Sequence, residues 1–161
     1  MQGLQTFEVS PIGRVQSDIR ELGDDCWAGT VAGIELDPAR FTEESTRGLA
    51  EFSHVELIFL FDRVAPEKVS YGSRHPRERE DWPKVGIFAQ RAKDRPNRIG
   101  TTICRLERVE GTTVWVRELD AADGTPVLDI KPYMAEFGPR GEVRQPEWSK
   151  ELMAGYFRPK T

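Results

Sequence analysis

The sequence predicts a mainly β protein, an all-β barrel or sandwich with little helix. Its apolar residues alternate with polar ones in short runs, which is the period of strands and not of helices. Six or seven such runs follow one another closely, without the regular strand and helix alternation of a doubly wound fold. At 161 residues the chain can bury one core without disulfides or metal, so we expect a single domain.

The first half of the chain contains three expected strands and one expected helix. A first strand, interrupted by a proline and a glycine, covers residues 7–15, and a second covers residues 29–36. An Asp-Pro pair then predicts a short helix over residues 37–52, because Asp can cap a helix and Pro fits its first turn. Residues 54–61 are apolar on both faces, so this strand should be central.

The second half begins with a polar stretch, residues 63–83, that predicts a long and mobile loop. A Glu-Gly pair at residues 110–111 is typical of a tight turn, so the strands on either side should form a hairpin. Apolar residues spaced by four predict a terminal helix over residues 147–156. The strands expected in this half cover residues 85–89, 101–109, 112–119 and 127–130.

Charge and composition exclude several classes of protein. A net charge of −4 argues against a broad electrostatic grip on nucleic acid, although residues 84–108 hold seven cations and only two anions. Two cysteines without C-x-x-C spacing and two histidines predict neither a disulfide framework nor a metal site. The longest apolar run, residues 57–61, is too short to span a membrane, and no secretory signal is recognisable. We therefore expect a cytoplasmic protein.

Residues 86–100 form the first candidate site, a strand followed by a basic loop that contains Pro, Asn and Gly. These three residue types favour turns and allow a ligand to approach the backbone closely. Arg91 and Arg95 could each bind a carboxylate or phosphate with two hydrogen bonds. The alternative is a well-built turn with surface cations.

Residues 119–133 form the second candidate site. In an extended segment Asp129, Lys131 and Tyr133 project from one face. Because a carboxylate beside a lysine keeps its charge, Asp129 could accept a hydrogen bond from an amine or a hydroxyl, while Lys131 or Tyr133 positions a substrate. The alternative is a structural ion pair that closes the sheet.

Three ordered motifs stand out in the second half of the chain. They are Phe88-Ala89-x-Arg91, Arg95-Pro96-Asn97-x-Ile99-Gly100, and Leu119-Asp120-x-x-Asp123-Gly124-Thr125-Pro126-Val127-Leu128-Asp129-Ile130-Lys131-Pro132-Tyr133. With the shorter segments Pro11-Ile12-Gly13 and Gly48-Leu49-x-x-Phe52-Ser53-His54, these motifs resemble the TsaA-like domain of the TrmO family, and the resemblance spans residues 7–135. It implies a small β-barrel that dimerises, binds S-adenosylmethionine and methylates the threonylcarbamoyl-modified adenosine beside the anticodon of tRNA.

Carried over position by position, the resemblance implies a cofactor site, and the two candidate sites above supply the expected catalytic and substrate-binding residues. Asp62 or Asp120 would meet amino or ribose groups, Arg91 the methionine carboxylate, and Trp27 the adenine or the sulfonium charge. Asp129, Lys131 and Tyr133 are the expected catalytic residues, and Arg95, Asn97 and Arg98 are expected to bind substrate. The implied cofactor residues are Trp27, Ala28, Gly29, Asp62, Arg63, Arg91, Thr101, Glu118, Leu119 and Asp120.

Two departures from the family pattern keep alternatives open. Arg98 replaces a proline that the family usually has. We also expect this protein to lack the second domain of the longer bacterial members. We expect residues 1–140 to form the cofactor-binding barrel and residues 141–161 a C-terminal extension with a short helix. The alternatives to tRNA methylation are methylation of a small molecule and a regulatory module that only binds the cofactor.

Overall fold

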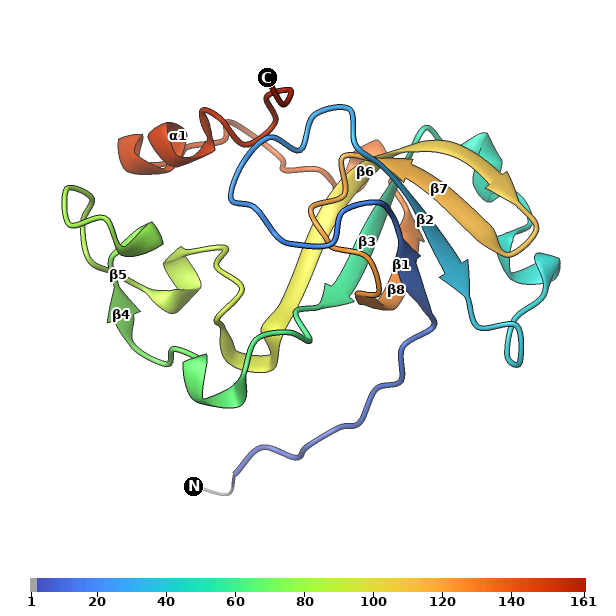
Figure 1. Cartoon of the computed structure of the whole chain (residues 1–161), viewed down its shortest axis with the longest axis horizontal. Helices are drawn as coiled ribbons and strands as arrows, with labels where there is room; N and C mark the ends of the chain where they lie inside the picture. Colours follow the sequence, from blue (N-terminus) through green and yellow to red (C-terminus); the bar gives the residue numbers. More distant parts are fainter. Residues whose placement is uncertain (1–2) are drawn as a thin grey trace.

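Six antiparallel strands close into a barrel in the order β1-β2-β7-β6-β3-β8 (Figure 1). This computed structural model describes residues 3–161. The barrel confirms the mainly β fold that the alternating sequence predicts. Its strands are β1 (Gly13–Gln16), β2 (Val31–Leu36), β3 (His54–Leu60), β6 (Ile99–Glu110), β7 (Thr113–Arg117) and β8 (Pro126–Pro132).

The barrel interior is filled by one face of each strand. In β3, Val55, Leu57 and Phe59 are buried while the residues between them are partly exposed. Gly100 allows β6 to approach closely, because a Cβ atom there would lie 2.6 Å from the Phe59 ring. The buried cluster consists of Val15, Ala32, Ile34, Val55, Leu57, Phe59, Cys104, Val114, Val116, Leu119, Ala121 and Val127.

β6 is longer than its neighbours and pairs with a different strand over each half. Its ladder with β3 runs from Ile99 to Arg105, whereas its ladder with β7 starts only at Arg105 and continues to Glu110. The expected hairpin between β6 and β7 is confirmed, with Gly111 at a φ of +61° in the turn. Within the described part of the chain, no strand pairs with the second edge of residues 99–104.

A smaller two-stranded sheet and short helices lie outside the barrel. The sheet pairs β4 (Ser73–Arg74) with β5 (Val85–Gly86), and α1 (Glu147–Met153) is the terminal helix. None of the helices within residues 3–161 is long and apolar enough to cross a membrane. The 3-10 helices cover Glu43–Thr46, Leu49–Glu51, Pro66–Lys68, Pro76–Glu78, Ile87–Ala89, Pro96–Arg98 and Ala135–Phe137.

Three expected elements differ from the structure. The helix expected over residues 37–52 is replaced by two 3-10 helices, since Gly48 between them has a left-handed φ of +82°. The first strand starts only at Gly13, and the Phe7 and Val9 side chains are 77% and 71% exposed. The strand expected over residues 85–89 ends after two residues and continues as a 3-10 helix.

Candidate functional site

The Asp120 carboxylate lies beside the half of β6 that has only one partner strand. The Thr102 hydroxyl donates to one oxygen of this carboxylate, and the Tyr156 hydroxyl donates to the other. The neighbouring Leu119 is 1% exposed in the barrel core, which fixes the backbone of Asp120. Burial, together with the Asp120 charge, raises the pKa of Tyr156, so its hydroxyl remains a donor at neutral pH.

Arg91 binds the same half of β6, at the strand edge that has no partner strand among the described residues. Its Nη2 donates to the Thr101 carbonyl oxygen at 2.6 Å, and its charge lowers the pKa of Tyr156 against the larger effects of burial and Asp120. One guanidinium nitrogen is therefore bound to the barrel, while the other N–H groups of this exposed side chain remain available for an anion.

The loop before β2 lies against the same region. The Trp27 amide donates to the Tyr156 carbonyl at 2.9 Å, and the Gly29 amide donates to Glu118 Oε1 at 3.2 Å. The Trp27 side chain is 4% exposed, yet its Nε1 has no hydrogen-bond partner among the described residues. A buried donor without an acceptor costs about 1–3 kcal/mol, so a ligand that supplies an acceptor would fit here.

Most of the expected cofactor residues are thus connected around one rim of the barrel, here called the Asp120 rim. They are linked through the hydrogen bonds of Thr102, Tyr156 and Glu118 or through the chain itself. The Asp120 rim comprises Trp27, Ala28, Gly29, Arg91, Thr101, Glu118, Leu119 and Asp120.

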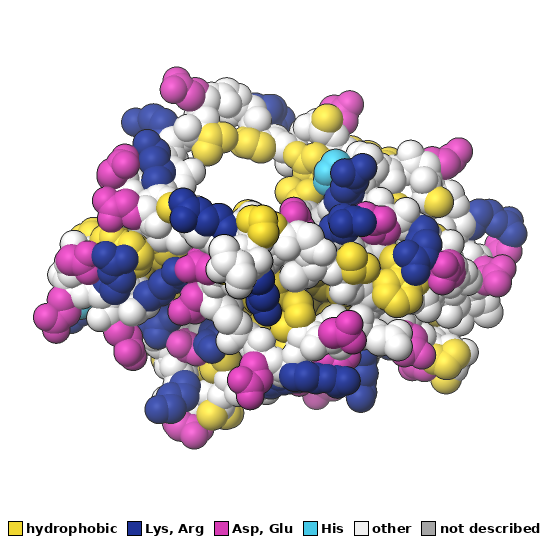
Figure 2. Space-filling view, turned by 45° about the horizontal axis from the view of Figure 1, so that its top comes forward, with side chains coloured by type: hydrophobic (Ala, Val, Ile, Leu, Met, Phe, Trp, Pro, Cys, Tyr) yellow, Lys and Arg dark blue, Asp and Glu magenta, His cyan; other side chains and the backbone are white. Residues whose placement is uncertain are grey.

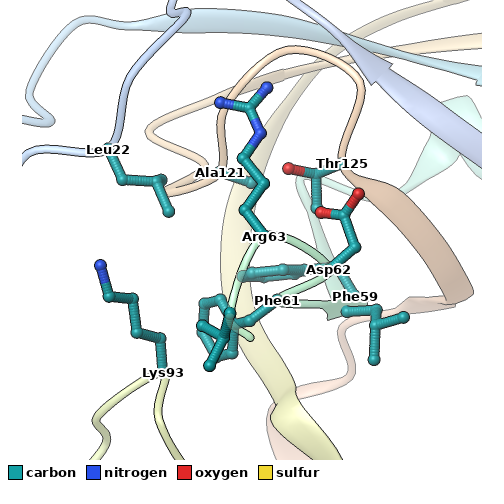
Figure 3. Close-up of a pocket in the computed structure, with 10 residues that line it drawn as sticks. Leu22, Phe59, Phe61, Asp62, Arg63, Lys93, Ala121 and Thr125 are labelled. Atoms are coloured by element: carbon teal, nitrogen blue, oxygen red, sulfur yellow. The ribbon is translucent and has the colours of Figure 1, made fainter. Parts of the chain in front are cut away.

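Asp62 and Arg63 lie in an adjoining pocket next to Ala121 (Figure 3). Arg63 donates to the carbonyl oxygens of Arg20 at 2.5 Å and of Asp123 at 2.7 Å, so it holds two loops together. The pocket measures about 50 Å³. Ligand sites for molecules of cofactor size are about 300–1,000 Å³, so this pocket alone is too small for the cofactor.

The basic turn before β6 contains Arg95, Asn97 and Arg98. Arg95 donates to the Gln90 carbonyl at 2.6 Å, and Arg98 donates to the Val64 carbonyl at 2.6 Å. Asn97 and Arg98 have left-handed φ values of +62° and +51°. Each guanidinium carries five N–H donors, so both arginines can stabilise the turn and still offer donors to a phosphate.

Asp129 and Lys131 form a salt bridge of 3.0 Å on the outer face of β8, with their side chains 48% and 61% exposed. The Lys131 ammonium donates to the Asp129 carboxylate, and this hydrogen bond raises the pKa of the lysine. In the sheet register these residues face Ile58 and Glu56 of β3, and Glu56 accepts a hydrogen bond of 3.0 Å from the Thr101 hydroxyl. Glu56 therefore connects Lys131, its cross-strand neighbour on β8, with Thr101 of the Asp120 rim.

Tyr133 follows the last residue of β8. Its amide donates to the His54 carbonyl at 3.0 Å, and a Cβ atom on Gly138 would lie 2.6 Å from its hydroxyl oxygen. The Tyr133 ring is thus covered by the chain that leads to the C-terminal segment, whereas Asp129 and Lys131 remain open to solvent.

Thr102 and Tyr156 are site residues that the sequence motifs do not predict. Tyr156 was expected only as part of the apolar face of the terminal helix, but α1 ends at Met153 and Tyr156 reaches Asp120 instead. Alternate residues of β6 face the barrel interior, so the period-two pattern could have indicated that the Thr102 side chain faces inward.

The surface view shows acidic and basic side chains interspersed on the face where the C-terminal part of the chain comes forward (Figure 2). The same face contains a hollow that is partly bordered by hydrophobic side chains. Among residues 3–161, no three His, Cys, Asp or Glu side chains gather as metal ligands would.

Comparison with known proteins identifies the family. The mouse tRNA (adenine(37)-N6)-methyltransferase is 44% identical over 95 residues, which are 59% of this chain and 22% of that protein. A "Probable S-adenosyl-L-methionine-binding protein" of Pyrococcus abyssi is 39% identical over 137 residues, 83% of this chain and 72% of that protein. The crystal structure of TrmO from Pseudomonas aeruginosa has a TM-score of 0.69 at 34% identity, and the match covers 87% of this chain and 62% of that chain.

This chain therefore spans less than two thirds of the mouse protein and of the crystallised chain. The model of the tRNA-methyltransferase O N-terminal domain matches residues 25–138, which include β2 to β8 and the whole Asp120 rim. On this match, which covers most of the barrel, the chain belongs to the TrmO family.

Proposed function

We propose that this protein binds S-adenosylmethionine at the Asp120 rim and transfers the methyl group to N6 of an adenosine in tRNA. The observation that carries the proposal is that Asp120 and the buried Trp27 both bond to Tyr156, while Arg91 bonds to Thr101, next to the Thr102 that donates to Asp120. An anion-binding guanidinium, a carboxylate acceptor and an aromatic ring match the carboxylate, the hydroxyl or amino groups, and the adenine of this cofactor. The names of the mouse and Pyrococcus abyssi relatives support the same function.

The cofactor would supply a methyl group activated by its sulfonium charge. The protein then needs mainly to align the acceptor nitrogen and to exclude water, because proximity accounts for much of the acceleration in such transfers. Asp129, Lys131 and Tyr133 are our candidates for positioning the acceptor. Asp129 and Lys131 are solvent-exposed and linked to the Asp120 rim through Glu56, which supports this role.

We further propose tRNA as the partner, with threonylcarbamoyl-modified adenosine as the acceptor and the basic turn at residues 95–98 as a phosphate contact. A cytoplasmic homodimer completes the proposal. Exposed apolar side chains at Ile103, Met134 and Phe137, which are 50%, 42% and 83% exposed, support association of two copies. Light scattering that gave only a monomer with cofactor present would contradict the dimer.

Methyl transfer can be tested with radiolabelled S-adenosylmethionine and three acceptor pools: tRNA with the threonylcarbamoyl group, tRNA without it, and the small molecules of a cell extract. Label in the first pool alone is the expected result. Label only in the small molecules would support the second enzyme activity. Cofactor binding without transfer to any pool would support a regulatory module.

A further inference from the structure

The C-terminal segment, residues 147–158, lies against the Asp120 rim although the family match ends at residue 138. Its backbone pairs with the loop before β2, through the amides of Cys26 and Trp27 and the carbonyls of Gly155 and Tyr156, at 3.2 and 2.9 Å. In Figure 1 this segment lies beside that loop at one end of the barrel. The segment is therefore docked by hydrogen bonds to the region proposed to bind cofactor.

α1 is docked on its other side as well. The Trp82 indole Nε1 donates to Glu151 Oε2 at 2.8 Å, and the Trp82 side chain is only 4% exposed. Trp82 belongs to the loop between β4 and β5, which is far from the loop before β2 in sequence. Two independent contacts thus hold Tyr156 in place.

Tyr156 and Thr102 bind different oxygens of the Asp120 carboxylate. One hydroxyl would leave the carboxylate free to rotate, whereas two hydroxyls on the two oxygens fix its plane. A carboxylate has about four lone-pair sites, so about two remain for a ligand after both bonds are made. We propose that Tyr156 is a positioning residue of the cofactor site, which orients Asp120 toward the hydroxyl or amino groups of S-adenosylmethionine. This inference rests on the proposed function.

A second observation points to a ligand at the same place. The Trp27 amide bonds to the Tyr156 backbone, and the buried Nε1 of Trp27 has no partner among residues 3–161. The segment that carries Tyr156 therefore forms one wall of the proposed site.

Calorimetric titration of S-adenosylmethionine into the full chain tests this role. Tyr156→Phe removes only the hydroxyl and keeps the edge-to-face contact with the Phe157 ring at 5.0 Å. We expect this variant to bind about three- to tenfold more weakly than the wild type, which is the effect of losing about one ordinary hydrogen bond, because Asp120 loses its orientation but can still bond to the cofactor. Tyr71→Phe is the matched control, because Tyr71 is 79% exposed, and its affinity should equal that of the wild type.

The double variant separates positioning from general destabilisation. In an Asp120→Asn background, Tyr156→Phe should have little further effect on affinity, since both changes act through the same carboxylate. Fully additive losses, or unchanged affinity in Tyr156→Phe, would overturn the inference while leaving cofactor binding established. Wild-type protein that shows no binding would refute the proposed function itself and this inference with it.

If Tyr156→Phe does not fold, trypsin proteolysis of the wild-type protein tests the same inference. Binding that depends on the docked segment must stabilise docking in return, so saturating S-adenosylmethionine should slow trypsin cleavage after Lys150, which lies within α1. We expect at least a severalfold slower cleavage there, with cleavage unchanged after Arg140, which is exposed and outside any helix or strand. Equal rates with and without cofactor would overturn the role of the segment.

Discussion

Arg77 donates to both carboxylate oxygens of Asp25 at 3.1 Å each, although the two residues are 52 positions apart in the chain. A further bond of 3.0 Å joins Arg77 to the Asp24 carbonyl. These bonds tie the polar stretch between β3 and β5 to the loop that carries Trp27. The long loop expected over residues 63–83 is therefore anchored at its middle.

Loss of the Arg77–Asp25 ion pair should destabilise the loop over residues 63–83 more than the barrel. We expect Arg77→Gln to lower the free energy of unfolding by about 1 kcal/mol, the upper range for partly exposed ion pairs. Urea denaturation measures the change. Arg47→Gln is the control, since Arg47 pairs with Glu44 where both side chains are at least 69% exposed, and an equal loss there would refute a special role for Arg77.

Arg91 should contribute to cofactor affinity more than any other cation of the barrel. We expect Arg91→Ala to weaken binding of S-adenosylmethionine by about 1.5–3 kcal/mol through loss of a charge-assisted hydrogen bond. Arg14→Ala is the control, because β1 lies opposite β6 in the barrel order and Arg14 is exposed. Calorimetry that gave equal affinities for the two variants would exclude Arg91 from the site.

Lys131 should affect turnover without affecting cofactor affinity. Because the salt bridge between Lys131 and Asp129 is exposed, its loss should cost little stability, and Lys131→Ala should fold. We expect turnover to fall at least about tenfold, which is about 1.4 kcal/mol of barrier. Lys150→Ala breaks a similarly exposed pair with Glu147 and should retain full turnover. Normal turnover of Lys131→Ala would show that the acceptor binds elsewhere.

Arg98→Pro restores the residue that the family usually has, but this backbone does not admit it. Proline fixes φ near −65°, whereas Arg98 has a φ of +51° and its amide donates to the Arg95 carbonyl at 2.9 Å. We expect Arg98→Pro to lower stability by about 2–4 kcal/mol. Arg98→Gly removes the same charge at a permissive φ and should stay folded, so thermal unfolding of both variants separates charge from backbone.

The two cysteines should differ in reactivity. Burial raises the pKa of the Cys104 thiol, and the nearby Asp120 and Glu118 charges raise it further. Cys26 lies in the loop before β2 and is partly exposed. In native protein we expect a disulfide reagent to label Cys26 alone, with Cys104 reacting only after unfolding, since the thiolate is the reactive form. Equal labelling rates would mean that the barrel opens readily.

The period-two pattern predicted the barrel strands because each strand buries one face. The sequence pattern predicted one helix over residues 37–52. Two short 3-10 helices form instead, because Gly48 between them has a left-handed φ. The pattern also could not predict the hydrogen bond between Tyr156 and Asp120, because these residues are 36 positions apart in the sequence. Periodicity shows which face of a segment is apolar but does not show which loop or end that face will meet.

The open edge of β6 has a consequence for how molecules of this protein behave in a crowded solution. A strand edge with free amides and carbonyls can pair with strands of other molecules and start aggregation. Along residues 99–104 the Arg91 guanidinium binds the Thr101 carbonyl, so a charged side chain occupies a position that a neighbouring strand would otherwise take. The same arginine that we expect to hold an anion would therefore also oppose edge-to-edge strand pairing between molecules at residues 99–104.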